Sequence, residues 1–441
     1  MNTVRHRAIA SALAVAVTAS AACGARAKLN VIDGTGANPV LPPPNGSLIP
    51  VVNVVTARGW PPDATPETPE GASVVAFARG LNHPRWLHVL PNGDVLVAET
   101  NAPARPDNGP KGLKGWFFAK YQKKAGGAVP SANRITLLRD ADGDGIAETR
   151  TVFLENLSSP FGMALVGNQL YIANSDALVR VPYAEGTTSI HVPPTKVGEL
   201  PGGTINHHWT KSLIASRDGT RLYVGSGSNS NVAERGMNNE IERACILEID
   251  PATGAHRLYA SGLRNPVGLA WEPSTGMLWT AVNERDELGS DLVPDYITSV
   301  REGAFYGWPY SYYGAIVDKR VKPPRPDLVE GAVKPDYALG PHTASLGLAY
   351  SAGADRAPIA GAGMYVGQHG SWNRKPRSGY KVIFVPFTGG KPSGLPRDVL
   401  TGFVKENGDA MGRPVGVAIA GDGALLVADD VGNAIWRVSR R

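Results

Sequence analysis

The chain has 441 residues, of which 42% are hydrophobic and 19% charged, and its formal net charge is +5. These values are ordinary for a globular protein, so they exclude a disordered or fibrous chain, and so mild a basicity gives no reason to expect a nucleic-acid partner. The 52 glycines and 36 prolines make up about a fifth of the chain and are spread along it. They predict many short strands joined by turns rather than long helices.

Residues 1–27 have the pattern of a secretion signal. Two arginines precede an uncharged run of small residues, and an A-x-A cleavage pattern ends at Ala27. Two outcomes fit this pattern, namely cleavage after Ala27 or a signal that ends in a lipidated Cys23. We therefore expect an exported protein, either periplasmic or anchored to a membrane by a lipid at Cys23, with no integral membrane span in its mature form.

Residues 28–70 are rich in Pro, Gly and Asn, as in GTGANPVLPPPNGS and WPPDATPETPEG. Such a composition predicts an extended arm on the surface of the protein. The folded domain is expected to occupy residues 71–441.

One pattern recurs along that domain. A polar or Pro-containing entry leads into a short apolar strand, a Gly-containing turn and a second apolar strand, as in GLNHPRWLHVLPNGDVLVAET and GRPVGVAIAGDGALLVADD. The six copies begin at Gly80, Asn156, Gly203, Gly262, His342 and Gly412. Antiparallel units that cannot bury both of their faces stack radially. The sequence therefore predicts an all-β fold, a six-bladed β-propeller.

Two insertions, 101–133 and 314–340, lengthen this repeat. The first surrounds the aromatic segment GWFFAKY with lysines, which are Lys111, Lys114, Lys120, Lys123 and Lys124. Two interpretations remain open, namely a solvated loop with an aromatic anchor or a docking patch for an acidic redox partner.

A His-His pair opens the third copy, in GTINHHWTKSLIAS. A histidine immediately before a strand is held at one end of the sheet, where it can face the central channel and act as a general base. Neighbouring residues of an extended chain point to opposite sides, so only one of His207 and His208 is expected to face the channel.

Polar residues that open the other copies, or follow their second strands, are expected to meet at the same end of the propeller. They are His208, Arg264, Asn265, the stretch Glu284 to Asp286, His342, Asn373, Arg374, Arg413 and Asp430. Several arginines and two histidines beside a few carboxylates suit a planar cofactor that carries carboxylates, because guanidinium groups bind carboxylates through two hydrogen bonds and stack on flat rings.

A separate acidic motif, DADGDGIAE, lies between two expected strands. It places carboxylates at relative positions one, three, five and nine, with glycines between them; these are Asp140, Asp142, Asp144 and Glu148. This spacing can wrap one calcium ion, in a structural role, as in EF-hand-like loops. The alternative is a solvated acidic turn.

Several of these segments together resemble a known family. The segments are NHHWTKSL, SGLRNPVGLAW, VNERDELGSDLVPDYI, FYGWPY, GPHTASLGLAY, QHGSWNR and GRPVGVAIAGDGALLVADD, and the resemblance spans about Phe77 to Arg437. The chain resembles the soluble PQQ-dependent sugar dehydrogenases, of the glucose, sorbosone, aldose sugar and pyranose dehydrogenase types. These proteins are six-bladed propellers, in agreement with the repeats.

The resemblance implies a role for each matching residue. It implies that His208 is the catalytic base, because His208 keeps the spacing of the family to the following strand. Arg264 and Asn265 would contact the quinone carbonyl that receives hydride, and the remaining implied cofactor contacts are His342, Arg374, Arg413 and Asp430. A calcium ion at the cofactor would be held by the segment that contains Arg285 and Asp286. The substrate would be an aldose, a pyranose or sorbosone, and the electron acceptor a cytochrome or a quinone.

Two other functions are compatible with a propeller, because a fold alone does not fix a function. A calcium-dependent lactonase would use carboxylates at the channel as metal ligands and His208 as the base for water. A non-catalytic propeller would bind glycans or proteins. Neither alternative needs Arg264, Arg374 and Arg413 together, so these arginines favour the quinoprotein.

Overall fold

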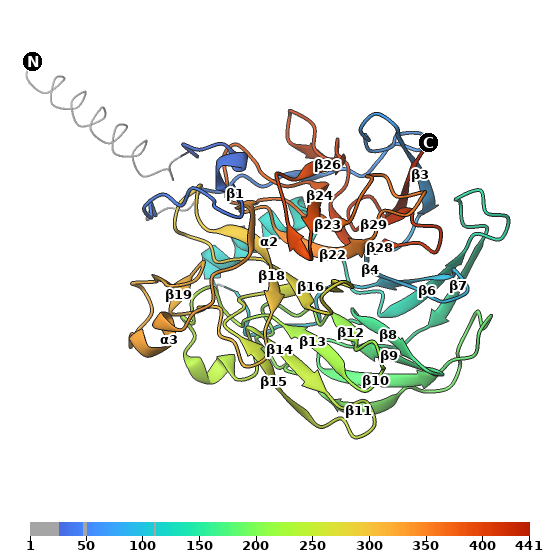
Figure 1. The fold of residues 1–441 in the computed structure, drawn as a ribbon, viewed down its shortest axis with the longest axis horizontal. Helices are drawn as coiled ribbons and strands as arrows, with labels where there is room; N and C mark the ends of the chain where they lie inside the picture. The colour runs from blue at the N-terminus through green and yellow to red at the C-terminus, as the bar shows by residue number, and fades with distance from the viewer. Residues whose placement is uncertain (1–25, 47–50, 110–111) are drawn as a thin grey trace, which may run out of the picture.

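A computed structural model describes residues 26–46, 51–109 and 112–441. Six antiparallel sheets follow one another in chain order around the molecule (Figure 1). This arrangement confirms the predicted six-bladed β-propeller. Residues 1–25 of the expected signal segment, including Cys23, lie outside the described residues. No helix in the described part of the chain is long and apolar enough to span a membrane.

The first three blades contain four strands each, named in order from the innermost strand outward. The first is formed by β4 (Pro84–Val89), β5 (Val95–Glu99), β6 (Arg134–Arg139) and β7 (Thr149–Leu154). The second is formed by β8 (Met163–Val166), β9 (Gln169–Ala173), β10 (Ala177–Pro182) and β11 (Thr195–Glu199). The third is formed by β12 (Leu213–Ala215), β13 (Leu222–Ser226), β14 (Cys245–Ile249) and β15 (His256–Ser261).

The next two blades carry extra strands. The fourth contains β16 (Pro266–Trp271), β17 (Leu278–Val282), β18 (Pro294–Val300), β21 (Tyr337–Pro341) and, from the arm, β1 (Thr35–Gly36). The fifth contains β22 (Ser345–Ser351), β23 (Gly363–Gln368), β24 (Lys381–Thr388) and β26 (Arg397–Leu400), and β25 (Lys391–Pro392) also pairs with β24.

The sixth blade joins the two ends of the propeller domain. It consists of β28 (Pro414–Ile419), β29 (Leu425–Asp429), β30 (Ala434–Arg440) and the early strand β3 (Ala72–Arg79). The register runs from Ala72 opposite Arg440 to Arg79 opposite Ala434. Because the backbone hydrogen bonds of β3 complete the last blade, they close the ring.

The remaining elements are short and lie outside the blades. They are η1 (Val31–Gly34), η2 (Met237–Glu240), α2 (Gly112–Lys124), α3 (Pro326–Glu330), the parallel pair β2 (Thr56–Ala57) and β27 (Asp409–Ala410), and the hairpin β19 (Ser311–Tyr312) and β20 (Ile316–Val317). The helix α2 belongs to the first insertion, where a loop was predicted. Of the lysines of that insertion, Lys111 and the side chain of Lys114 lie outside the described residues.

The core lies between neighbouring blades, where aromatic rings interlock. Trp86 and Phe161 join the first and second blades with ring centroids 4.6 Å apart, and Trp279 and Phe387 join the fourth and fifth at 5.0 Å. The second strands β5, β13, β17 and β29 are buried along their whole length. Because both faces of each blade are covered, these strands appear in the sequence as continuous apolar runs.

A glycine in the innermost strands lets neighbouring blades meet at the axis. A Cβ on Gly268 would lie 2.4 Å from Leu348 Cβ, and one on Gly347 would lie 2.2 Å from the Val415 carbonyl oxygen. These distances are shorter than any van der Waals contact, so only glycine allows the strands to pack this closely. Close packing at the axis therefore explains why the segments VGLA, LGLA and VGVA of the repeats share a glycine.

Candidate active site

The expected site residues gather at one end of the ring because of the strand order. Each innermost strand begins, and each second strand ends, at the same end, since the two strands are antiparallel. Arg264 and Arg413 lie just before β16 and β28, while Asp286 and Asp430 follow β17 and β29. The topology therefore brings together side chains that are far apart in the sequence.

His208 has a defined proton arrangement. Its Nδ1 lies 2.8 Å from the Ser228 carbonyl oxygen and 3.1 Å from Ser228 Oγ, whose own proton goes to the Ser230 carbonyl oxygen 2.6 Å away. Both neighbours of Nδ1 therefore accept, so Nδ1 carries the proton and Nε2 keeps its lone pair. Burial, together with Arg264 and His207, lowers the pKa of His208 well below its usual 6.5. His208 is thus a neutral imidazole whose Nε2 can accept a proton.

His207 lies against His208 but has different partners. The two rings meet edge to face with centroids 4.6 Å apart. Nδ1 of His207 is 2.8 Å from Asn108 Oδ1, on the first insertion. Burial, with Arg264 and Arg105, lowers the pKa of His207 to about 4. His207 therefore connects the insertion to the end of the third blade.

Arg264 is a fixed cation next to the histidine pair. Its side chain is 2% exposed and donates to Asn231 Oδ1 at 3.0 Å, to the Glu284 carbonyl oxygen at 2.7 Å and to the Asn283 carbonyl oxygen at 3.3 Å. Asp286 Oδ2 lies 3.6 Å from the guanidinium. These partners come from the β13–β14 and β17–β18 connections, so Arg264 holds two blades together at the channel.

Asp286 and His342 form an ion pair beside Arg264, in which His342 is buried and Asp286 is partly exposed. His342 Nε2 lies 2.8 Å from the Gly289 carbonyl oxygen and its Nδ1 lies 3.4 Å from Asp286 Oδ1, so both ring nitrogens face acceptors. Burial lowers the pKa of His342, but the hydrogen bond and negative charge of Asp286, with the Gly289 carbonyl oxygen and Asp295, together outweigh it and raise the pKa. For Asp286, burial acts to raise the pKa, but His342 and Arg264 lower it to about 2. Asn373 donates to the same carboxylate at 2.7 Å.

Asp430 is the centre of a second cluster, between the last and first blades. Its Oδ2 accepts from Arg85 at 2.7 Å and lies 2.9 Å from His369 Nε2 and 3.6 Å from His83 Nε2. Burial raises the pKa of Asp430, but the two histidines and Arg85 outweigh it and hold that pKa well below its usual value. Arg413 donates to the His369 carbonyl oxygen at 3.0 Å. Arg85, His83 and His369 were not among the predicted site residues.

Some polar atoms of this group are buried without a partner. Four of the buried side-chain atoms that hydrogen-bond to no described residue are Asn265 Oδ1, Asn373 Oδ1, Asp430 Oδ1 and Arg85 Nε. They belong to residues of four different blades. Buried polar atoms are normally paired, so such atoms around one channel suit a bound polar ligand. The cations Arg264, Arg413 and protonated His342 fit a cofactor that carries carboxylates, whereas the three unpartnered oxygens fit hydrogen-bond donors of a ligand.

Comparison with known proteins identifies the family. The sequence matches the TrAA12-like family over residues 131–298 and 329–441, more than half of the chain. The chain belongs to the TrAA12-like family. It is 26% identical over 294 residues to a pyrroloquinoline quinone-dependent pyranose dehydrogenase of Coprinopsis cinerea, a match that covers 53% of this chain and 40% of that enzyme. It is 27% identical over 300 residues to an uncharacterized protein of Borreliella burgdorferi, which covers 64% of this chain and 76% of that protein.

Solved structures show the same fold. The holo PQQ domain of the Coprinopsis cinerea pyranose dehydrogenase aligns with a TM-score of 0.67 at 20% identity, over 88% of this chain and all of that one (100%). A PQQ-bound aldose sugar dehydrogenase of Streptomyces coelicolor aligns with a TM-score of 0.55 at 19% identity, over 85% and 99% of the two chains. The resemblance to PQQ-dependent sugar dehydrogenases drawn from the sequence is confirmed.

Arg374 does not join the channel group in this TrAA12-like protein. Its guanidinium donates to the Leu29 carbonyl oxygen at 2.8 Å, to the Ser290 carbonyl oxygen at 3.0 Å and to the Pro376 carbonyl oxygen at 2.9 Å, and Asp291 lies 3.5 Å away. The predicted cofactor contact is therefore corrected, because Arg374 anchors the arm of residues 28–70. Its neighbour Asn373 points to Asp286 instead.

The acidic stretch after β17 does not fit a calcium ion held by the carbonyl of Asp286. Arg285 donates to that oxygen from Nη2 at 2.6 Å and from Nε at 3.0 Å, and Asn231 donates to it at 3.2 Å. The side chain of Arg285 is buried against Asp318. A carbonyl oxygen beside a guanidinium is a poor cation ligand, and the Asp286 carboxylate is occupied by His342 and Asn373. The oxygens of Asp286 are therefore poor ligands for the calcium ion expected at Arg285 and Asp286.

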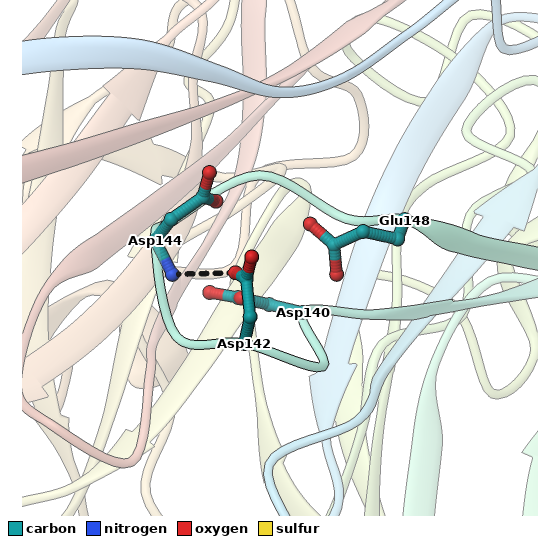
Figure 2. A group of neighbouring side chains, drawn as sticks. All are labelled: Asp140, Asp142, Asp144 and Glu148. Atoms are coloured by element: carbon teal, nitrogen blue, oxygen red, sulfur yellow. Dashed lines mark hydrogen bonds between the residues drawn. The ribbon is translucent and has the colours of Figure 1, made fainter.

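The DADGDGIAE motif forms the connection between β6 and β7. Figure 2 shows its four carboxylates converging on one side of the loop, and the atoms that could bind a metal lie within 4.8 Å of one another. Asp140 also accepts from the Gly143 and Gly145 amides at 2.7 and 2.9 Å, which fixes the loop. The structure brings Asp140, Asp142, Asp144 and Glu148 together, and calcium there stays a prediction.

Proposed function

We propose that this TrAA12-like protein oxidises a sugar with PQQ as its cofactor and His208 as the general base. The observation that carries the proposal is the hydrogen bond from His208 Nδ1 to the Ser228 carbonyl oxygen, which leaves Nε2 unprotonated beside a group of buried cations. Membership of the TrAA12-like family and the named pyranose dehydrogenase relative support the same chemistry.

The cofactor would be held by residues from four blades. The residues proposed to hold it are Arg264, Asn265, His342, Arg413 and Asp430, and the unpartnered Nε of Arg85 adds a further donor. When bound, PQQ supplies the acceptor for the hydride that leaves the sugar carbon. Arg264 and protonated His342 provide fixed positive charge at the place where negative charge would develop, in a buried setting where such charge acts strongly.

His208 would take the proton of the oxidised hydroxyl at Nε2. Loss of that proton and of a hydride from the adjacent carbon turns the hydroxyl into a carbonyl, so the charges balance. The Ser228 carbonyl oxygen keeps the imidazole in the tautomer that can accept, and the Arg264 charge disfavours a resting imidazolium. His208 is therefore ready to accept a proton at neutral pH.

The finer features of the function are proposed from the sequence. The substrate class is an aldose, a pyranose or a sugar aldehyde such as sorbosone, and the acceptor of the electrons is a cytochrome or a quinone. The protein is exported, to the periplasm or to a membrane through a lipid at Cys23. Calcium is proposed at the loop of Asp140 to Glu148, in a structural role.

A lactonase is less well supported. A calcium-dependent hydrolase needs free carboxylates at the channel, whereas Asp286 and Asp430 are each paired with a histidine and lie beside an arginine. Purified protein should develop the absorption of a bound quinone when PQQ is added, with or without calcium, and sugars from a panel should then reduce a dye. Absence of quinone binding in both metal conditions would refute the proposal.

A further inference from the structure

The first insertion forms one wall of the candidate active site. It leaves the first blade after β5, and its loop around Asp107 packs on the segment that carries the histidine pair, with the Asp107 amide donating to the Thr204 carbonyl oxygen at 3.2 Å. Arg105 donates to the His207 carbonyl oxygen at 2.7 Å, and Asn108 bonds the His207 ring. The insertion thus places new side chains one imidazole ring away from His208.

Two arginines at this wall have no acidic partner among the described residues. Arg105 uses only its Nη1 in hydrogen bonds, so within the described residues the Nε–Nη2 edge, which binds carboxylates through two bonds, is unused. Arg235 donates to the Asp107 carbonyl oxygen at 2.9 Å and to Asn108 Oδ1 at 3.2 Å. Neither guanidinium makes a salt bridge with a described carboxylate, whereas Arg264 lies 3.6 Å from Asp286.

The nearby carboxylates do not neutralise these arginines. Glu234 accepts from the backbone amides of Asn231 and Val232 at 3.1 and 2.8 Å. The side chain of Asp107 is exposed, and the hydrogen bond from Arg235 goes to its backbone oxygen. Arg105 with a free donor edge and Arg235 without a described acidic partner therefore lie beside the histidine pair.

We propose that Arg105 and Arg235 bind an anionic group of the substrate, so that the site takes a sugar acid rather than a neutral sugar. The inference rests on the proposed function, since it assigns the other end of the substrate to His208. His207 lies between the two groups, since its ring contacts the His208 ring and its carbonyl oxygen accepts from Arg105. The shared chemistry is a carboxylate or a phosphate on a sugar ring.

Galactose and galacturonate test this inference because they differ in one carboxylate. Binding of each to the full chain without cofactor is measured by calorimetry, and oxidation of each is measured after PQQ loading. Galactose 6-phosphate, in a third arm, distinguishes a phosphate from a carboxylate. The variants are Arg105→Gln and Arg235→Gln, and the control is Arg217→Gln, an exposed arginine in the β12–β13 turn at the opposite end of the blade.

We expect an anionic sugar to bind at least about tenfold more tightly than galactose, and each site variant to remove most of that preference, because a charge-assisted hydrogen bond has this magnitude. The Arg217→Gln control should keep it. Equal binding of all three sugars, or an equal loss for galactose and galacturonate in the variants, would overturn the inference. Arginine-dependent binding without oxidation of any sugar would uphold it and refute the proposed function instead.

Discussion

The buried carboxyl of Glu284 provides a test of the site that does not depend on any ligand. Its side chain is 4% exposed, and burial raises its pKa to about 7 from the usual 4.5, although the Arg285 amide and Arg264 act in the opposite direction. Between these two values the folded protein holds more protons than the unfolded chain, so the free energy of unfolding falls as pH rises through that range. The raised pKa of Glu284 lowers the free energy of unfolding by about 1 kcal/mol at pH 5 and by about 3 kcal/mol at pH 8.

In the parent protein the Arg285 amide donates to Glu284 Oε2 at 3.0 Å. Glu284→Gln removes the charge and keeps an oxygen that can accept this hydrogen bond. The variant should therefore gain about 2 kcal/mol more stability at pH 8 than at pH 5, which for a chain of this size is a Tm difference of about 2 °C by scanning calorimetry. The control is Glu185→Gln on the exposed surface, whose effect should not vary with pH. A Glu284→Gln effect that is equal at both pH values would refute the assignment of a buried, neutral carboxyl.

Three further outcomes follow from the structure. Arg374→Met should lower the free energy of unfolding by about 3 kcal/mol in denaturant, because it removes one partner of a buried charged network. It should also expose residues 28–70 to protease. An arm that stays protected would show that Arg374 does not anchor it. Gly227→Ala should abolish quinone binding, because its Cβ would lie 2.2 Å from Asn265 Oδ1 and 2.5 Å from His208 Cβ; normal quinone affinity would show that this contact does not shape the site. Calcium should raise the Tm of the parent protein but not of Asp142→Asn, and an equal rise in both would remove the calcium proposal for that loop.

Much of the fold was predictable because each blade repeats the same local pattern. The entry, strand and Gly-containing turn recur in the sequence, and the glycine before LA or VA marks the place where blades touch at the axis, as at Gly268 and Gly347. The helix α2 was not predicted, since its sequence GLKGWFFAKYQKK lacks a clear apolar stripe. The pairing of β3 with β30 depends on contacts between the two ends of the domain, which local patterns do not encode.

The site was predictable only in part. Arg264, His342 and Asp430 open or close a repeat, so their places at the channel follow from the strand order. The roles of Arg85 and His369 depend on Asp430, which is 345 residues from Arg85, and no local motif reveals such a partner. Adjacent residues also diverge, since Asn373 reaches Asp286 while Arg374 turns to the arm. A sequence motif therefore locates the site but does not determine which side chains enter it.

The central claim is that the free Nε2 of His208 removes the substrate proton. The most direct measurement is the rate at which a sugar reduces the PQQ-loaded protein in a single turnover, for His208→Gln and for the neighbouring control His207→Gln. His208→Gln should lower this rate by about 10²–10⁴-fold with unchanged quinone binding, and His207→Gln should have a far smaller effect. A His208→Gln protein that reduces its quinone as fast as the parent would show that His208 is not the base.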